Sequence, residues 1–232
     1  MIRSMLEPLN QTAARVPDRV AFYDDREQMT YAQLRRAARS IGTALTTLAR
    51  PGQAVALLLD PRSIQNIPAL YGALYAGCAY APMDISMPPE RLRQLLGLLE
   101  PAAVIVDEKG GKALDAAGWR GAPTLSYREA LETADDEEKL AAIEKTIGPD
   151  APMSILYTSG STGVPKGSVQ THGSYIQWTD ATIRMYGLGE DTVFGNQSPF
   201  FYANSILDIF PPVALGARVY LLPAGCSPFP ES

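Results

Sequence analysis

The stretch ILYTSGSTGVPKG, residues 155–167, joins a short apolar run to a segment rich in hydroxyl side chains and glycine, with one lysine near its end. The run SILY, residues 154–157, predicts a buried strand, and a helix is expected after the loop. In such an arrangement backbone N–H groups can point at phosphate oxygens, while hydroxyls and a lysine add donors and positive charge. The stretch therefore predicts a polyphosphate site made by Thr158, Ser159, Gly160, Ser161, Thr162, Gly163 and Lys166.

Two familiar phosphate-binding loops do not fit this stretch. The Walker A pattern requires glycine before its lysine and serine or threonine after it, whereas Pro165 and Gly167 flank Lys166. The dinucleotide G-x-G-x-x-G pattern also fails, because the glycines have the wrong spacing. A plain surface loop is the alternative, since glycine, serine and threonine are common in loops. The regular pattern after a buried strand favours phosphate binding.

Apolar runs and helical patterns alternate along the rest of the chain. AVALLL at residues 54–59 and AVIV at residues 103–106 are continuous apolar runs, typical of strands buried on both faces. This alternation predicts the α/β fold class, with parallel-rich sheets covered by helices. Thr30 with Gln33 predicts a capping box, and Ser63 predicts another helix start. Further helices are expected at residues 2–15, 91–99, 172–186 and 206–213, and further strands at 20–23, 192–194 and 218–222.

A polar stretch divides the chain. Residues 107–150 are richer in charge and glycine, and we interpret them as a surface connection with short helices. We therefore expect a first α/β part over residues 1–150. A second part over residues 151–232 carries the phosphate loop and the start of the following subdomain.

Composition excludes several classes of protein. The 232 residues carry a net charge of -5, which argues against a nucleic-acid partner because such partners bind a basic face. The N-terminus lacks an apolar signal segment, and no apolar run is long enough to span a membrane. Cys78 and Cys226 lie far apart, which favours reduced, packed thiols. We therefore expect a cytoplasmic protein without a membrane partner.

Four segments together resemble one family. Residues 157–167, YTSGSTGVPKG, resemble the phosphate-loop signature of the adenylate-forming (AMP-dependent synthetase/ligase) superfamily. TYAQL at residues 30–34, LYAGCAYAPMD at 74–84 and SPFFYANSILDIF at 198–210 resemble the first, second and fourth core motifs of amino-acid adenylation domains. The resemblance covers essentially the whole chain. It is strongest to the adenylation domains of nonribosomal peptide synthetases and to D-alanine–carrier-protein ligase.

The resemblance implies an ATP-dependent acid–thiol ligase. A carboxylic acid substrate would react with ATP and Mg²⁺ to give an acyl-adenylate, and the acyl group would pass to a phosphopantetheinyl carrier protein or to CoA. In the family the adenine pocket, the catalytic lysine and the C-terminal domain lie downstream of the fourth motif. No catalytic residue is therefore expected in this chain, which would be an N-terminal fragment unable to form an adenylate at a useful rate. A non-catalytic remnant that binds a nucleotide or another protein is the alternative.

The fourth motif departs from the amino-acid-activating pattern. Relatives that activate amino acids read F-D-x-S there, and the aspartate pairs with the substrate's α-ammonium; here an alanine, Ala203, stands at the acidic position. A one-residue shift would place Asn204 there instead, where it could hydrogen-bond a neutral polar group. A buried cation without its partner is costly. The departure favours an aryl, fatty, hydroxy or keto acid over a standard α-amino acid. The expected substrate pocket consists of Phe201, Tyr202, Ala203 and Asn204.

Two further residues carry expectations. His172 is the only histidine, and without a second histidine or a nearby cysteine we expect no metal site. Relatives often carry a histidine here, beside the acyl pocket; we expect it to have a structural, helix-capping role, with a general base as the alternative. Asp208 is expected to be structural and to lie near a helix start.

Overall fold

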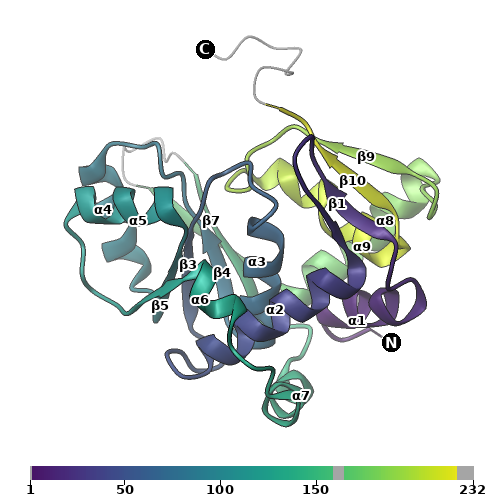
Figure 1. The fold of residues 1–232 in the computed structure, drawn as a ribbon, viewed down its shortest axis with the longest axis horizontal. Helices are drawn as coiled ribbons and strands as arrows, with labels where there is room; N and C mark the ends of the chain where they lie inside the picture. Colours follow the sequence, from purple (N-terminus) through teal and green to yellow (C-terminus); the bar gives the residue numbers. More distant parts are fainter. Residues whose placement is uncertain (1, 159–164, 224–232) are drawn as a thin grey trace.

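Two sheets lie side by side, with helices between and around them (Figure 1). The structure is a computed structural model that describes residues 2–158 and 165–223. The predicted α/β class with parallel-rich sheets is confirmed. Five residues of the predicted phosphate loop lie outside the described residues: Ser159, Gly160, Ser161, Thr162 and Gly163.

The larger sheet has six strands in the order β6-β5-β3-β4-β7-β8. Neighbouring strands are parallel except β7 and β8, which form an antiparallel hairpin. Its strands are β3 (Ala54–Leu58), β4 (Ala79–Pro82), β5 (Ala103–Val106), β6 (Thr124–Ser126), β7 (Pro152–Thr158) and β8 (Lys166–Thr171).

The smaller sheet has four strands in the order β2-β1-β10-β9 and combines distant parts of the chain. Strand β10 pairs in parallel with both β1 and β9, while β1 and β2 are antiparallel. Both sheets contain strands from before and after residue 150, so the division expected there does not coincide with a boundary between sheets. The strands are β1 (Val20–Tyr23), β2 (Gln28–Thr30), β9 (Val193–Asn196) and β10 (Arg218–Leu221).

Helices cover these sheets. The predicted capping box is confirmed, because the Thr30 side chain accepts from the Gln33 N–H and the Gln33 side chain accepts from the Thr30 N–H. Within residues 2–158 and 165–223, every helix is too short or too polar to serve as a membrane span. The helices are α1 (Leu6–Arg15), α2 (Tyr31–Leu45), α3 (Asn66–Tyr75), α4 (Pro89–Leu99), α5 (Glu108–Ala117), α6 (Tyr127–Leu131), α7 (Glu137–Thr146), α8 (His172–Tyr186), α9 (Phe210–Leu215) and the 3-10 helix η1 (Ala203–Asp208).

Several local predictions were wrong. Ser63 does not cap α3, which begins three residues later behind Gln65 without a side-chain cap. The helix expected at residues 206–213 is two elements, η1 and α9, because Pro211 and Pro212 lack the N–H groups needed to continue a helix and instead open a new one. Strand β8, and not a helix, follows the phosphate loop. Strands β2, β4 and β6 were missed, although the short helices of the 107–150 connection are present.

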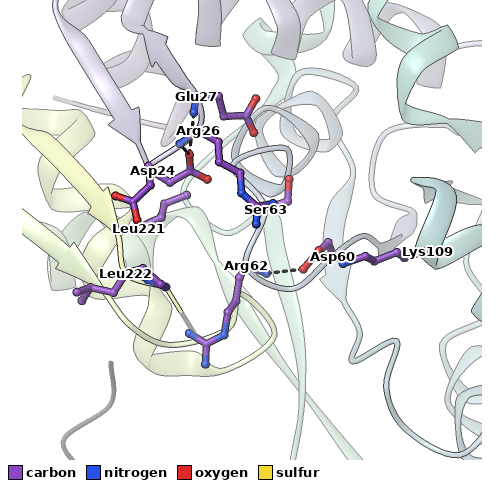
Figure 2. A pocket seen from close by; sticks show the side chains of 11 residues that line it. Asp24, Arg26, Glu27, Asp60, Arg62, Ser63, Lys109, Leu221 and Leu222 are labelled. Carbon is purple, nitrogen blue, oxygen red and sulfur yellow. Dashed lines mark hydrogen bonds and ion pairs between the residues drawn. The ribbon is translucent and has the colours of Figure 1, made fainter. Parts of the chain in front are cut away.

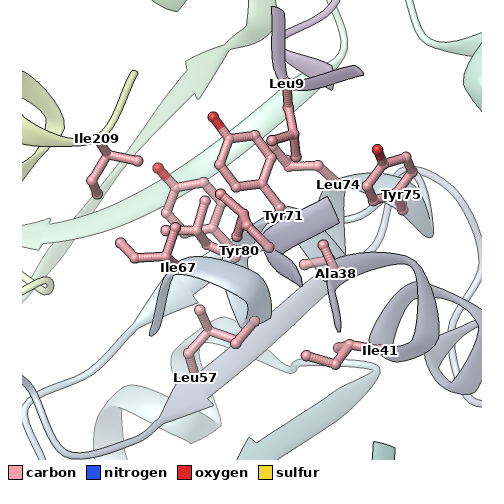
Figure 3. Packing of buried hydrophobic residues seen from close by; sticks show 14 of the residues in the cluster. Leu9, Ala38, Ile41, Leu57, Ile67, Tyr71, Leu74, Tyr75, Tyr80 and Ile209 are labelled. Atoms are coloured by element: carbon pink, nitrogen blue, oxygen red, sulfur yellow. The ribbon is translucent and has the colours of Figure 1, made fainter. Parts of the chain in front are cut away.

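One cluster of buried hydrophobic residues extends across both sheets. Within it, helices α2 and α3 cross in close contact. A Cβ atom on Gly72 would lie 2.5 Å from Ile41 Cγ2, and one on Gly42 would lie 2.7 Å from Tyr75 Cβ. Only glycine at these two positions lets the helices approach so closely. Figure 3 shows Tyr71, Tyr75 and Tyr80 in the same cluster of buried residues as Ile41 and Leu57.

Candidate functional site

The hairpin β7–β8 carries the two ends of the predicted phosphate loop. Thr158 ends β7 and lies opposite Lys166, the first residue of β8. The Lys166 side chain is exposed, and it makes no hydrogen bond or ion pair with the described part of the chain. Strand β8, and not a helix, follows the predicted phosphate loop, so the contribution expected from a following helix N-terminus does not apply. Of the residues predicted to bind phosphate, Thr158 and Lys166 are the two that the structure describes.

The register of the hairpin places Lys166 on the same face as a row of neutral polar side chains. Leu156 lies opposite Ser168, and Ser154 lies opposite Gln170. Because side chains alternate along a strand, Lys166, Ser168 and Gln170 share one face of β8. Lys166 is therefore about 7 Å along the strand from Ser168.

A hollow of about 550 Å³ covers this face of the hairpin, between β7–β8, α8 and η1. Ala203 and Asn204, which were predicted to form the substrate pocket, line it. Its described lining contains neither an acidic nor a basic side chain. The lining residues are Leu156, Ser168, Gln170, Ser174, Tyr175, Trp178, Ala203, Asn204, Ile206 and Leu207.

The other two predicted pocket residues lie apart from this lining. The rings of Phe201 and Tyr202 pack against each other with centroids 4.5 Å apart, and Tyr202 is exposed. Phe200 is buried, and its N–H donates to the Pro61 carbonyl (3.1 Å). Arg62 Nη1 also donates to the Gln197 carbonyl (2.9 Å). The loop after β3 therefore fixes the segment that leads into Ala203 and Asn204.

Helix α8 supplies the floor of the hollow through Tyr175. The Tyr175 hydroxyl lies 2.8 Å from Ser154 Oγ and accepts from the Tyr80 hydroxyl (3.3 Å). Its ring meets Phe210 edge-on, with centroids 4.9 Å apart. Burial raises the pKa of Tyr175, so it stays protonated and able to donate at neutral pH. These contacts fix the ring in place under the hollow.

His172 begins α8 but does not cap it. The cap is Thr171, whose side chain accepts from the Ser174 N–H in a capping box, so the capping role expected for His172 was wrong. His172 is only 2% exposed, and its Nδ1 accepts from the Met5 N–H (3.1 Å). Burial lowers its pKa to about 4. His172 thus ties the N-terminal segment to the start of α8.

Asp208 ends η1 and is not among the residues that line the hollow. Its Oδ2 accepts from Asn196 Nδ2 (3.1 Å), which joins η1 to the end of β9. Burial raises its pKa to about 6, against the opposing effect of this hydrogen bond.

A second hollow of about 460 Å³ lies where strands β1, β3 and β10 end (Figure 2). It is lined by charges of both signs, of which Lys109 Nζ lies 2.5 Å from Asp60 Oδ2. The hydroxyl of Tyr220 in β10 donates to Oδ1 of Asp25, another lining residue (2.6 Å). In the part of the chain that the structure describes, no three His, Cys, Asp or Glu side chains gather to hold a metal ion.

Of the residues that line the first hollow, the sequence predicted only Ala203 and Asn204 as pocket residues. Ser168 and Gln170 belong to β8, whose KGSVQT sequence has no apolar run. Tyr175 and Trp178 stand three residues apart on one helix face, which is also the pattern of core residues. The alternation of Lys166, Ser168 and Gln170 was the one available signal.

Comparisons with known proteins identify the family. The chain belongs to the AMP-binding enzyme family, whose model matches residues 9–231. It is 30% identical to a mycosubtilin synthase of Bacillus subtilis over 222 residues, which are 95% of this chain and 8% of that protein. It is 27% identical to the D-alanine–D-alanyl carrier protein ligase of Listeria innocua, covering 94% of this chain and 43% of the ligase.

The solved structures give the same result. The chain superposes on the nonribosomal peptide synthetase FmoA3 with a TM-score of 0.84 and 29% identity, over 95% of this chain and 23% of that one. The AMPPNP-bound form of FmoA3 matches with a TM-score of 0.82 and 27% identity, over the same shares of the two chains. The chain spans less than half the length of each of these relatives.

Proposed function

We propose that the protein carrying this chain is an ATP-dependent acyl-adenylating ligase. The observation that carries the proposal is the shared face of β8, on which Lys166 is in line with Ser168 and Gln170, two residues that line a neutral hollow with room for an acyl group. A carboxylate held there can attack the α-phosphate, breaking the bond to the β-phosphate as pyrophosphate leaves. Family membership and the AMPPNP-bound relative support ATP as the nucleotide.

The role of this chain's residues is to bind and to stabilise charge. Lys166, Thr158 and the loop residues Ser159, Gly160, Ser161, Thr162 and Gly163 would hold the β- and γ-phosphates, where negative charge builds up as pyrophosphate departs. The exposed Lys166 ammonium, which pairs with none of the described residues, fits this role. Mg²⁺ commonly binds through substrate phosphates, so we propose that it enters with ATP and neutralises their charge.

The substrate is a carboxylic acid without an α-ammonium group. Ala203 lines the hollow, and the resemblance puts it at the position of the aspartate of amino-acid-activating relatives; the described lining has no acidic side chain to replace it. A desolvated ammonium would therefore lack a partner. The names of the carrier-protein ligases among the relatives support a phosphopantetheinyl carrier protein as the acceptor, with CoA as the alternative. We place the reaction in the cytoplasm, where ATP and reduced thiols are available.

ATP–pyrophosphate exchange with a panel of carboxylic acids tests the proposal on the longest natural form of the protein. Exchange should require ATP, Mg²⁺ and one class of acid, and Lys166→Ala should reduce it by about a hundredfold. Absence of exchange with every acid, from folded protein, would overturn the proposal. Transfer of the acyl group to a phosphopantetheinylated carrier or to CoA then identifies the acceptor.

A further inference from the structure

Asn66 is a buried polar residue that does not line the hollow. It begins α3 and is only 3% exposed. Its Nδ2 donates to the Asp60 carbonyl (2.7 Å) and to the Ser63 carbonyl (2.9 Å). A side-chain amide carries two N–H donors, so this one residue can hold both carbonyls at once. Asn66 therefore fixes the loop after β3, residues 60–63, from the inside.

This loop holds the segment of chain that leads into η1. The Phe200 N–H donates to the Pro61 carbonyl (3.1 Å). Arg62 Nη1 donates to the Gln197 carbonyl (2.9 Å). Residues 197–200 belong to no helix or strand, so contacts of this kind decide where their backbone lies. The loop thus sets the position of the segment, and Asn66 sets the position of the loop.

The segment is bonded in turn to η1. Ser205 Oγ donates to the Tyr202 carbonyl (2.7 Å) and reaches the Phe200 carbonyl at 3.3 Å. Ser205 is buried and lines a small cavity of about 10 Å³ together with Asn66. Ile206 lines both this cavity and the hollow. Asn66 therefore lies close behind the wall that η1 contributes to the hollow.

We propose that Asn66 is a positioning residue for the acyl site: through residues 60–63 it holds η1, which carries Ala203 and Asn204 in the wall of the hollow. The inference rests on the proposed function, which makes this hollow the place where the acid binds. In the described part of the chain, no hydrogen bond joins the loop to Thr158 or Lys166. The predicted phosphate contacts are therefore expected to stay in place when Asn66 changes.

Steady-state kinetics on the longest natural form of the protein test this. Asn66→Leu keeps a branched side chain but removes both donors. With the acid that supports the fastest ATP–pyrophosphate exchange in wild type, we expect the KM for the acid to rise about fivefold and the KM for ATP to stay the same. A merely structural role would reduce the amount of folded enzyme, which lowers kcat without changing the KM for the acid. An unchanged KM for the acid therefore overturns the inference.

Further variants locate the effect. Asn66→Asp replaces the Nδ2 donor by an oxygen that faces two carbonyls, so it should raise the KM for the acid at least as much as Asn66→Leu. The matched control is Gln65→Ala, because the Gln65 side chain makes no hydrogen bond to the described residues. An effect of Gln65→Ala as large as that of Asn66→Leu contradicts the inference. If Asn66→Leu does not fold, Arg62→Met, which removes the donor to the Gln197 carbonyl, carries the same expectation.

Amide hydrogen exchange without substrate separates this inference from the proposed function. In Asn66→Leu the amides of residues 203–208 should exchange about fivefold faster than in wild type, while those of β8 should not change. Faster amide exchange there, in a protein that catalyses no ATP–pyrophosphate exchange, would support the positioning of η1 and refute the ligase. Unchanged amide exchange there, in an active ligase, would refute the positioning role and leave the proposed function intact.

Discussion

The crossing of α2 and α3 and the hairpin β7–β8 belong to one body but are built under opposite constraints. At the crossing, and where α5 meets β3, backbones come so close that only glycine fits. Along the hairpin, the first four residues of β8 are exposed, and two of them, Lys166 and Ser168, have polar side chains. The first region tolerates almost no change in volume, whereas strand β8 of the second contributes little to the core. The difference implies that the hairpin face is free to vary with the ligand while the scaffold stays fixed.

The largest effect is expected for Gly110→Ala in α5. A Cβ atom there would lie 1.6 Å from the Leu58 carbonyl oxygen, so helix and strand must move apart. We expect the free energy of unfolding, measured by urea denaturation, to fall by about 3 kcal/mol or more. The neighbouring Gly111→Ala is the control, since its Cβ would meet nothing nearer than 4.0 Å. That change should stabilise the helix by about 0.5–1 kcal/mol.

The acid sensitivity of the scaffold is the next largest effect. The pKa of His172 is lowered by burial from 6.5 to about 4, so folding favours its neutral form. The stabilisation is complete above pH 6.5 and is lost as pH falls toward 4, because the unfolded state binds the proton first. We expect a loss of about 2–3 kcal/mol across this window. His172→Gln can still accept from the Met5 N–H and should lack this slope.

Urea denaturation at several pH values compares wild type with His172→Gln. Asp208 titrates in an overlapping range with the opposite slope, because burial raises its pKa to about 6. Its contribution is common to both proteins and cancels in the difference. If the free energy of unfolding changed with pH in the same way in both proteins, protonation of His172 would not be coupled to unfolding, and the prediction would be wrong.

Two buried tyrosines make a matched pair. The Tyr31 hydroxyl lies 2.6 Å from the Ala217 carbonyl and 2.9 Å from that of Pro212, whereas the Tyr71 hydroxyl is buried without a hydrogen-bond partner in the described structure. Tyr31→Phe should cost about 2 kcal/mol, because the Ala217 carbonyl loses its donor. Tyr71→Phe should be neutral or stabilising by up to about 1 kcal/mol. Thermal unfolding of both variants checks the difference, and equal losses would contradict it.

The same contrast explains what the sequence could predict. Strands β3 and β5 were predicted because continuous apolar runs mark buried parallel strands, and α2 because Thr30 and Gln33 form a local capping box. The sequence of β8 contains no such local signal, because this strand forms through its pairing with β7. In the hollow, Ala203 and Asn204 were predicted as pocket residues from the resemblance to the family. Trp178 and Gln170 line one hollow only because α8 lies beside β8 in the fold, and no local sequence pattern predicts that.

The smallest effects are expected on the hairpin face itself, where one cross-strand pair gives the sharpest comparison. Ser154 and Gln170 lie opposite each other, but Ser154 is fully buried and contacts the Tyr175 hydroxyl, while Gln170 lines the hollow. Ser154→Ala should lower the free energy of unfolding by about 1–2 kcal/mol, because that hydroxyl loses a partner. Gln170→Ala, like Ser168→Ala, should change it by no more than about 0.5 kcal/mol. If Gln170→Ala lowered the free energy of unfolding as much as Ser154→Ala, the polar side chains on this face of β8 would be part of the scaffold. The idea that they are available to a ligand would then be wrong.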